Sequence, residues 1–297
     1  MNHKTLCNVP EIEIIDYNKN ASHILVIELN ELLSIHGEII TNPHRIGYYQ
    51  LLFIIEGSGK LLIDSNEYCL NNKTMFAVSK GQIQIMEYDK KIKGFALLFS
   101  EDYIYKYPQD LGWINNLLLF DLSTSSPVIN LPDTEYLELL IILSKIRAEL
   151  GFEGAFAKDE ILINLLKTFL LIVERIKRAE LGNNIHSGGE WQYLTKFKEI
   201  LEEHYFTSRS VQHYAKLVGV TPKKLNEITS DCYGKPAKRV IEERVLLEIK
   251  RLLIYTNKTV KEIGYSLGFN DPTNFIKFFK KYIKVTPAEF RSSHKKI

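Results

Sequence analysis

Two short stretches in the last third of the chain carry side chains of the types that read DNA bases. In the first, Asn226 suits adenine, Glu227 suits the amino group of cytosine, and Lys223 suits guanine or a phosphate. The second stretch runs from Asp271 to Lys277 and offers a similar mixture of polar and charged groups. The candidate base-reading residues are Thr221, Lys223, Lys224, Asn226 and Glu227 in the first stretch, and Asp271, Pro272, Thr273, Asn274 and Lys277 in the second.

Other basic side chains could contact the DNA backbone. Phosphate contacts fix a protein on the duplex without reading its sequence. The candidates are Arg244, Lys261, Lys280 and Lys281, and the alternative for each is an ordinary solvated surface position.

Other kinds of site are not predicted. The sequence contains no GxSxG, P-loop, HExxH or GxGxxG motif, so no catalytic residue and no cofactor is expected. The three cysteines, Cys7, Cys69 and Cys232, lie far apart, which excludes a disulfide scaffold and a cysteine-rich zinc module and fits a reducing cytoplasm. The N-terminus lacks the apolar core of a signal peptide, and the apolar run near Phe169 is too short to span a membrane.

Charge is distributed unevenly along the chain. The 297 residues have a formal net charge of +2. Residues 191–297 contain 21 Lys and Arg against 11 Asp and Glu, a net charge of +10, so the first 190 residues carry −8. This asymmetry points to a basic nucleic-acid-binding module joined to a module of another kind.

The two candidate stretches lie in a region whose helix start and stop signals are clear. Ser210 is expected to cap a helix over 211–218 that Gly219 ends, and Thr221 with Pro222 to begin the next helix. By helical spacing Leu225, Ile228, Phe275, Phe278 and Phe279 face the core. Later helices are expected to begin at Pro236, Thr259, Asp271 and Thr286, the first ending near Tyr255 and the second at Gly268.

Two segments of this region repeat. Tyr214-Ala-Lys-Leu-Val-Gly-Val-Thr-Pro222 aligns with Ile263-Gly-Tyr-Ser-Leu-Gly-Phe-Asn-Asp-Pro272, and Gly219 lies 49 residues before Gly268. A small residue allows two helices to cross closely, and a glycine four positions later permits the positive φ of a tight turn. The pattern predicts two helix-turn-helix units joined by a long helix, each presenting its second helix to a major groove.

These motifs also resemble a known family. From Ser210 to Arg291 the chain resembles the double helix-turn-helix domain of the AraC/XylS family of bacterial transcription regulators, most closely over 263–281 and 286–291. Three positions depart from the family pattern: Thr229 replaces an aromatic residue, Gly264 an alanine and Lys284 a turn glycine. The first two departures are expected to loosen the packing, and none removes a candidate DNA-facing side chain.

The N-terminal half has the pattern of a small antiparallel β-barrel or sandwich followed by two helices. Strands are expected at 50–55, 60–64, 74–78, 83–87 and 94–99, the first two forming a hairpin around Glu56-Gly-Ser-Gly59. Helices are expected at about 133–150 and 156–179. The wide apolar face of the second helix either packs into the same domain or forms a dimer interface, for which the sheet is the other candidate.

This half resembles, more weakly, the cupin-like sensor domain of the same family, through Pro43-His-Arg45, the glycine turn at 56–59 and Ser79-Lys-Gly-Gln82. Metal-binding cupins have a second histidine two positions after the first, where this chain has Ile46, and Gly81-Gln-Ile-Gln84 offers no other. A single imidazole does not hold a transition metal, so no metal site is predicted. His44 and Tyr49 are the candidate residues of an effector pocket.

The sequence therefore predicts an α+β protein: a cupin-like β-barrel with flanking helices and an all-α domain with two helix-turn-helix units. The expected parts are a regulatory domain at 1–132, a helical dimerisation or packing segment at 133–181, a flexible linker at 182–190 and the DNA-binding domain at 191–297. The expected function is sequence-specific, AraC-type transcription regulation under small-molecule control, without enzymatic activity. Double-stranded DNA, RNA polymerase, a small-molecule effector and a second copy of the chain are the expected partners, in the cytoplasm. The alternatives are a cupin-type enzyme with a helical appendage and a nonspecific nucleic-acid-binding protein.

Overall fold

The computed structural model describes residues 9–18, 23–89, 91–100, 103, 117–121, 126–181 and 191–294. They divide into two compact units, one within Pro10–Asn183 and one within Asn184–Ile297, to which Val9 is also assigned; these are called the N-terminal and C-terminal units below. The predicted linker, 182–190, lies outside the described residues. Within the described residues, none of the helices combines the length and apolar character needed to cross a membrane.

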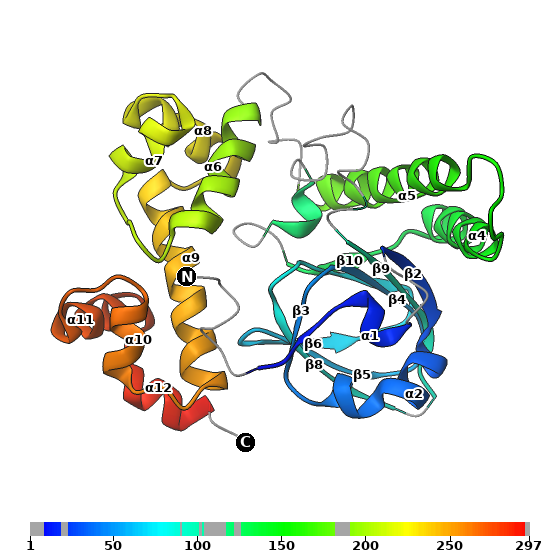
Figure 1. The fold of residues 1–297 in the computed structure, drawn as a ribbon, viewed down its shortest axis with the longest axis horizontal. Coiled ribbons are helices and arrows are strands. Elements are labelled where there is room, and N and C mark those ends of the chain that lie inside the picture. The colour runs from blue at the N-terminus through cyan, green and yellow to red at the C-terminus, as the bar shows by residue number, and fades with distance from the viewer. Residues whose placement is uncertain are drawn as a thin grey trace. The chain divides into compact units, whose positions relative to one another are not determined.

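The N-terminal unit contains two five-stranded sheets (Figure 1). All neighbouring strands are antiparallel except β1 and β3, which are parallel. In order across the first sheet, the strands are β1 (Glu11–Ile12), β3 (His44–Ile46), β8 (Ile83–Tyr88), β5 (Gly59–Ile63) and β6 (Asn66–Leu70). Those of the second sheet are β10 (Val128–Asn130), β7 (Thr74–Val78), β4 (Tyr49–Glu56), β9 (Lys93–Phe99) and β2 (Ile24–Glu28).

The α+β class and the predicted strand segments are confirmed, whereas the closed barrel and the first hairpin are wrong. Among the described strands, pairing occurs within the two sheets and not between them, so the unit is a sandwich. The strands expected to form a hairpin belong to different sheets: β4 pairs with β7 and β9, and β5 with β6 and β8. The physical reason lies in the connecting turn, where Gly57 has φ 116° and the β4–β9 register shifts after Ile54, so the chain crosses to the other sheet.

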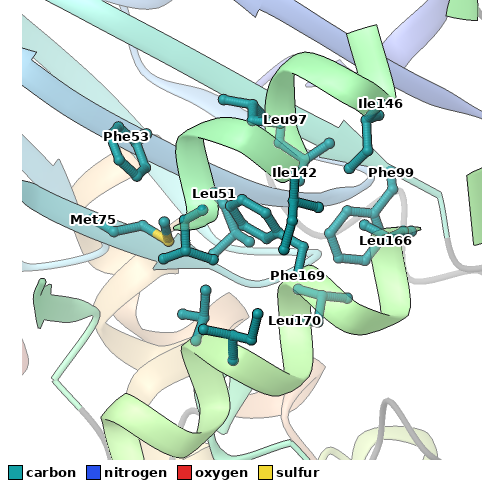
Figure 2. Close-up of a cluster of buried hydrophobic side chains, with 14 of the residues drawn as sticks. Leu51, Phe53, Met75, Leu97, Phe99, Ile142, Ile146, Leu166, Phe169 and Leu170 are labelled. Carbon is teal, nitrogen blue, oxygen red and sulfur yellow. The ribbon is translucent and has the colours of Figure 1, made fainter. Parts of the chain in front are cut away.

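Alternation of side chains along the second sheet gives the N-terminal unit two hydrophobic clusters. In β4, Leu52 and Ile54 point between the sheets, where α1 (Ile14–Tyr17) and α2 (Leu29–Thr41) complete the first cluster. Leu51 and Phe53 point to the opposite face and pack with α4 (Asp133–Leu150) and α5 (Lys158–Leu181). Figure 2 shows this second cluster, in which the sheet residues meet Ile142 and Ile146 of α4 and Leu166, Phe169 and Leu170 of α5.

The two predicted helices are confirmed, and most of the wide apolar face of α5 lies in this intramolecular core. Of the residues predicted to form that face, six are buried: Leu162, Leu166, Phe169, Ile172, Val173 and Ile176. Ile161 is 41% exposed and therefore departs from the predicted core face. A short 3-10 helix, η4 (Leu118–Phe120), is attached to α5 by Glu174. The Glu174 carboxylate accepts hydrogen bonds from the backbone N–H groups of Leu118 and Leu119.

The described part of the C-terminal unit is helical. Its helices are α6 (Trp191–His204), α7 (Val211–Val218), α8 (Pro222–Tyr233), α9 (Ala237–Tyr255), α10 (Val260–Ser266), α11 (Pro272–Ile283) and α12 (Pro287–His294). In Figure 1, α9 is the long helix between the pair α7–α8 and the pair α10–α11. Hydrophobic residues from the seven helices and their connections form one cluster, so both pairs share a single core.

Candidate nucleic-acid interface

The first helix pair has the caps and the turn that its sequence predicts. The Ser210 hydroxyl accepts from His213 N at the start of α7, and Thr221 Oγ1 accepts from Lys224 N at 3.1 Å at the start of α8. Between the helices, Gly219 has φ 91° in the left-handed region. Leu225 and Ile228 of α8 are fully buried, which confirms their prediction as core residues and fixes the opposite face of α8 outward.

The second pair repeats this construction with different caps. Thr259 and Glu262 form a reciprocal capping box at α10, and Asp271 Oδ1 accepts from Thr273 N at 2.9 Å at α11. Gly268 takes φ 72° in the turn. Phe275 and Phe279 are fully buried and Phe278 is half-buried against the same core, as predicted.

The three departures from the family pattern have definite places in this packing. A Cβ at Gly264 would lie 3.2 Å from Cγ of Phe275, so the glycine permits a close crossing and does not loosen the packing, contrary to expectation. Thr229 is fully buried and its hydroxyl donates to the backbone oxygen of Asn226 at 3.2 Å. Lys284 adopts φ 70° after α11, the conformation in which a glycine was expected.

Most of the candidate base-reading residues lie on the outward faces of α8 and α11. In the first pair Lys224 is half-buried, 3.9 Å from Glu227, and Thr221, Lys223 and Glu227 are exposed. In the second pair Pro272 is half-buried, and the exposed candidates are Asp271, Thr273, Asn274 and Lys277. The fold therefore groups these hydroxyl, amide, carboxylate and ammonium groups on two helix faces.

The structure gives two candidates other partners. Asn226 is half-buried, and its Oδ1 accepts from the backbone N–H of Ala237 at 3.0 Å, at the start of α9. A bidentate contact with adenine needs that oxygen, so this hydrogen bond argues against base reading by Asn226. Arg244 is 8% exposed, donates to Glu202 from Nε at 2.6 Å and Nη2 at 2.8 Å, and stacks on Tyr205. A guanidinium so enclosed does not reach a phosphate, and Arg244 instead joins α6 to α9.

The remaining phosphate candidates, Lys261, Lys280 and Lys281, are exposed. The Lys261 ammonium lies 5.9 Å from the centre of the Tyr265 ring, and that of Lys281 lies 4.7 Å from the centre of the Tyr282 ring. A hydrogen bond with Tyr282 raises the pKa of Lys281, so this side chain remains a cation. Both helices of the second pair therefore carry exposed lysines, Lys261 on α10 and Lys280 and Lys281 on α11.

The comparisons with known proteins agree with this arrangement. Residues 214–293 match the protein-family model described as a helix-turn-helix domain. Over 251 residues the chain is 19% identical to the HTH-type transcriptional activator RhaS of an Enterobacter species, covering 84% of this chain and 86% of that one. The Msm operon regulatory protein of Streptococcus mutans is 23% identical over 258 residues, covering 82% and 84%.

The C-terminal unit is an AraC-type helix-turn-helix domain. The resemblance read from residues 210–291 is thereby confirmed. Among solved structures, ToxT from Vibrio cholerae aligns with a TM-score of 0.41 and 15% identity, covering 91% of this chain and 97% of that one.

Sequence reasoning missed an apolar side chain on the outward face of the AraC-type domain. Ile276 of α11 is 37% exposed, between Thr273 and Lys277 in sequence. The run Phe275-Ile-Lys-Phe-Phe279 is apolar except for Lys277, which concealed the difference between Ile276 and the three phenylalanines. At 100° per residue, however, Ile276 does not share the face on which Phe275 and Phe279 are buried. Helical spacing could therefore have predicted that Ile276 is exposed.

The two effector-pocket candidates lie in different parts of the N-terminal unit. His44 is 1% exposed between the sheets, where its Nδ1 contacts Asn42 O at 2.9 Å and its Nε2 contacts Gln84 Nε2 at 3.0 Å. Gln50 of the opposite sheet donates to Gln84 Oε1 at 2.9 Å. Tyr49 is next to Gln50 and points to the other face, against Phe99 and Phe120. His44 and Tyr49 therefore do not form one pocket.

Burial lowers the pKa of His44, so the ring is neutral at pH 7, and both its nitrogens already have partners. Its neutral form is consistent with Nδ1–H donating to Asn42 O and Nε2 accepting from Gln84. Among the residues that the structure describes, no group of three or more His, Cys, Asp and Glu side chains is placed to hold a metal ion.

Proposed function

We propose that this protein is a sequence-specific transcription regulator that binds double-stranded DNA through its two helix-turn-helix pairs. The observation that carries this proposal is the outward display of polar and basic side chains on α8 and α11, both fixed to one core around α9. Two recognition helices on one rigid body can enter successive major-groove segments about 34 Å apart on one face of the DNA.

We assign base reading to the exposed faces of both recognition helices. The residues are Thr221, Lys223, Lys224 and Glu227 on or beside α8, and Asp271, Pro272, Thr273, Asn274, Ile276 and Lys277 on or beside α11. Ile276 suits the methyl group of thymine. Lys261, Lys280 and Lys281 are assigned to phosphates. Loss of one such contact weakens binding to all sequences and reduces the slope of log affinity against log salt concentration by about one.

We further propose that the N-terminal unit is a cupin-like regulatory module that responds to a small molecule. The hydrogen-bonded cluster of His44, Gln50 and Gln84 supports this proposal, because it places polar side chains in the mainly apolar space between the sheets. Titration calorimetry of the full-length protein with candidate metabolites tests it. A compound that binds and changes DNA affinity supports the module, and a complete screen without one counts against it.

The other parts of the proposal concern organisation and partners. We propose domains at 1–132, 133–181 and 191–297 with a linker at 182–190, a homodimer, contact with RNA polymerase on the promoter, and a cytoplasmic location without enzymatic activity. The exposed apolar residues Leu137 and Ile141, one turn apart on α4, support a helix-mediated dimer.

The decisive experiment is a footprint of the full-length protein on the DNA upstream of its own gene, across a salt series. Protection that persists at physiological salt, in segments about one helical turn apart, supports sequence-specific binding by both recognition helices. Diffuse protection that disappears at moderate salt favours a nonspecific binder. Metal analysis of the purified protein tests the enzyme alternative, because stoichiometric iron, manganese or zinc would favour a cupin-type enzyme.

A further inference from the structure

The loop between α6 and α7 reaches the turn of the second helix pair. The Arg209 side chain donates from Nη1 to Leu267 O and from Nη2 to Gly268 O, both at 2.9 Å. Its guanidinium carbon also lies 3.9 Å from the centre of the Phe269 ring. One side chain of the first half of the domain therefore holds three consecutive residues of the second half, including carbonyls at the end of α10.

The backbone of the same loop packs directly against Gly268. A Cβ at Gly268 would lie 2.4 Å from Phe206 O, a distance at which atoms overlap. The equivalent Gly219 has a similar positive φ, but a Cβ there would meet nothing within 4 Å. The two turns have similar backbone conformations, but of these two glycines only Gly268 packs against the α6–α7 loop.

The loop is itself anchored to the first half of the domain and to α9. The Tyr214 hydroxyl donates to Ser208 O at 2.8 Å, and Lys238 Nζ donates to Arg209 O at 2.8 Å. Tyr214 is fully buried in α7 and Lys238 is part of α9. A displacement of the second turn would therefore be resisted by α7 and α9 through Arg209.

We propose that Arg209 is a positioning residue that sets the separation and orientation of the two recognition helices, and so the spacing of the DNA segments that the protein accepts. The inference rests on the proposed function. It assigns Arg209 to the protein's own turn and not to a phosphate. Arginine suits this role because its planar guanidinium can donate to two carbonyls while it stacks on an aromatic ring, which a lysine ammonium cannot do.

The test compares wild type, Arg209→Lys and Lys277→Ala, as full-length proteins, on three DNAs. The first is the site found by footprinting, the second has one base pair added between its two segments, and the third retains only the segment bound by the first helix pair. One added base pair changes the separation by about 3.4 Å and rotates one segment about the axis. Wild type should bind the lengthened site at least about tenfold more weakly than the native one, because both helices must engage together.

Arg209→Lys keeps the charge and should bind the native site about tenfold more weakly, with a smaller penalty for the added base pair. Its affinity for the single segment and its salt dependence should match those of wild type. Lys277→Ala serves as the comparator for a lost DNA contact, with weaker binding on both two-segment DNAs. The proposal is overturned if Arg209→Lys matches wild type on all three DNAs, or weakens all three equally.

Hydrogen exchange of the DNA-free proteins gives an arm that is independent of DNA binding. Arg209→Lys should raise the exchange of the amides of Gly268 and Phe269 while leaving those of Gly219 and Val220 unchanged. Unchanged exchange at Gly268 overturns the positioning role. A wild type that recognises no two-segment site contradicts the proposed function instead, so the two failures are distinguishable.

Discussion

At the scale of the residue, Asn226 and Glu227 are neighbours on α8 whose side chains have different surroundings. Asn226 accepts a hydrogen bond from Ala237 N, whereas Glu227 is exposed on the outward face. Glu227→Ala should relax selectivity at one base pair, where a good base contact discriminates by about 1–3 kcal/mol. Affinity for other sequences should stay the same or rise, because a negative charge near the phosphates is lost. Binding to a set of DNAs with each base of the site changed measures this, and uniform weakening would contradict the role.

Asn226→Ala is the matched comparison on the same helix. Loss of the hydrogen bond to Ala237 should lower the free energy of unfolding by about 1 kcal/mol in urea denaturation. The base preferences should be those of wild type, and a change of preference at one position would restore the base-reading assignment. Sequence alone could not separate these neighbours, because the partner of Asn226 is 11 residues away beyond a turn.

His44 supplies a prediction on pH at the same scale. Burial lowers its pKa, so near and below about pH 6.5 the unfolded chain takes up a proton that the folded chain resists. Wild-type stability should therefore fall as the pH decreases below that value. His44→Gln should lose less stability than wild type between about pH 7.5 and about pH 5.5, measured by urea unfolding. His23→Gln removes an exposed histidine of the same unit and is the control, and an equal loss in all three proteins would refute the assignment.

At the scale of the element, the success of sequence reasoning depended on how local the signals were. Ser210, Thr221, Thr259 and Asp271 cap helices within three residues of themselves, so the helix boundaries of the C-terminal unit could be predicted. The strand segments could also be read, but not their partners. The residues of β4 pair with β7 and β9, which begin at Thr74 and Lys93, and the glycine turn after β4 does not reveal that choice.

The two turn glycines give a prediction at this scale. Gly219→Ala should cost about 1–2 kcal/mol, since alanine resists the left-handed conformation and meets no neighbour there. Gly268→Ala should cost about 1–3 kcal/mol more, because its methyl group would overlap Phe206 O. Urea denaturation of the two variants measures the difference in their free energies of unfolding. Equal losses of stability would mean that the α6–α7 loop moves away from the added methyl group without an energetic penalty.

At the scale of the whole molecule, the proposed dimer doubles the length of DNA that can be read. A monomer with two recognition helices covers two groove segments, and a dimer covers four. In a dimer, binding of one protomer to the DNA raises the effective concentration of the other protomer near its own segments. Affinity for a four-segment site therefore depends on the dimer even though no DNA contact changes.

Leu137 and Ile141 of α4 are 61% and 56% exposed, and a partner helix seated on them would bury both. We expect the double variant Leu137→Glu, Ile141→Glu to sediment as a monomer and to protect two segments of a four-segment site, with wild-type affinity for a two-segment DNA. Ile35→Glu is the control, because Ile35 is 63% exposed on α2 and should leave the dimer intact. If the double variant remains a dimer while Ile35→Glu does not, the interface lies on the α2 side of the sandwich. If both variants remain dimeric, neither helix face holds the dimer, and the exposed edges of the sheets become the place to look.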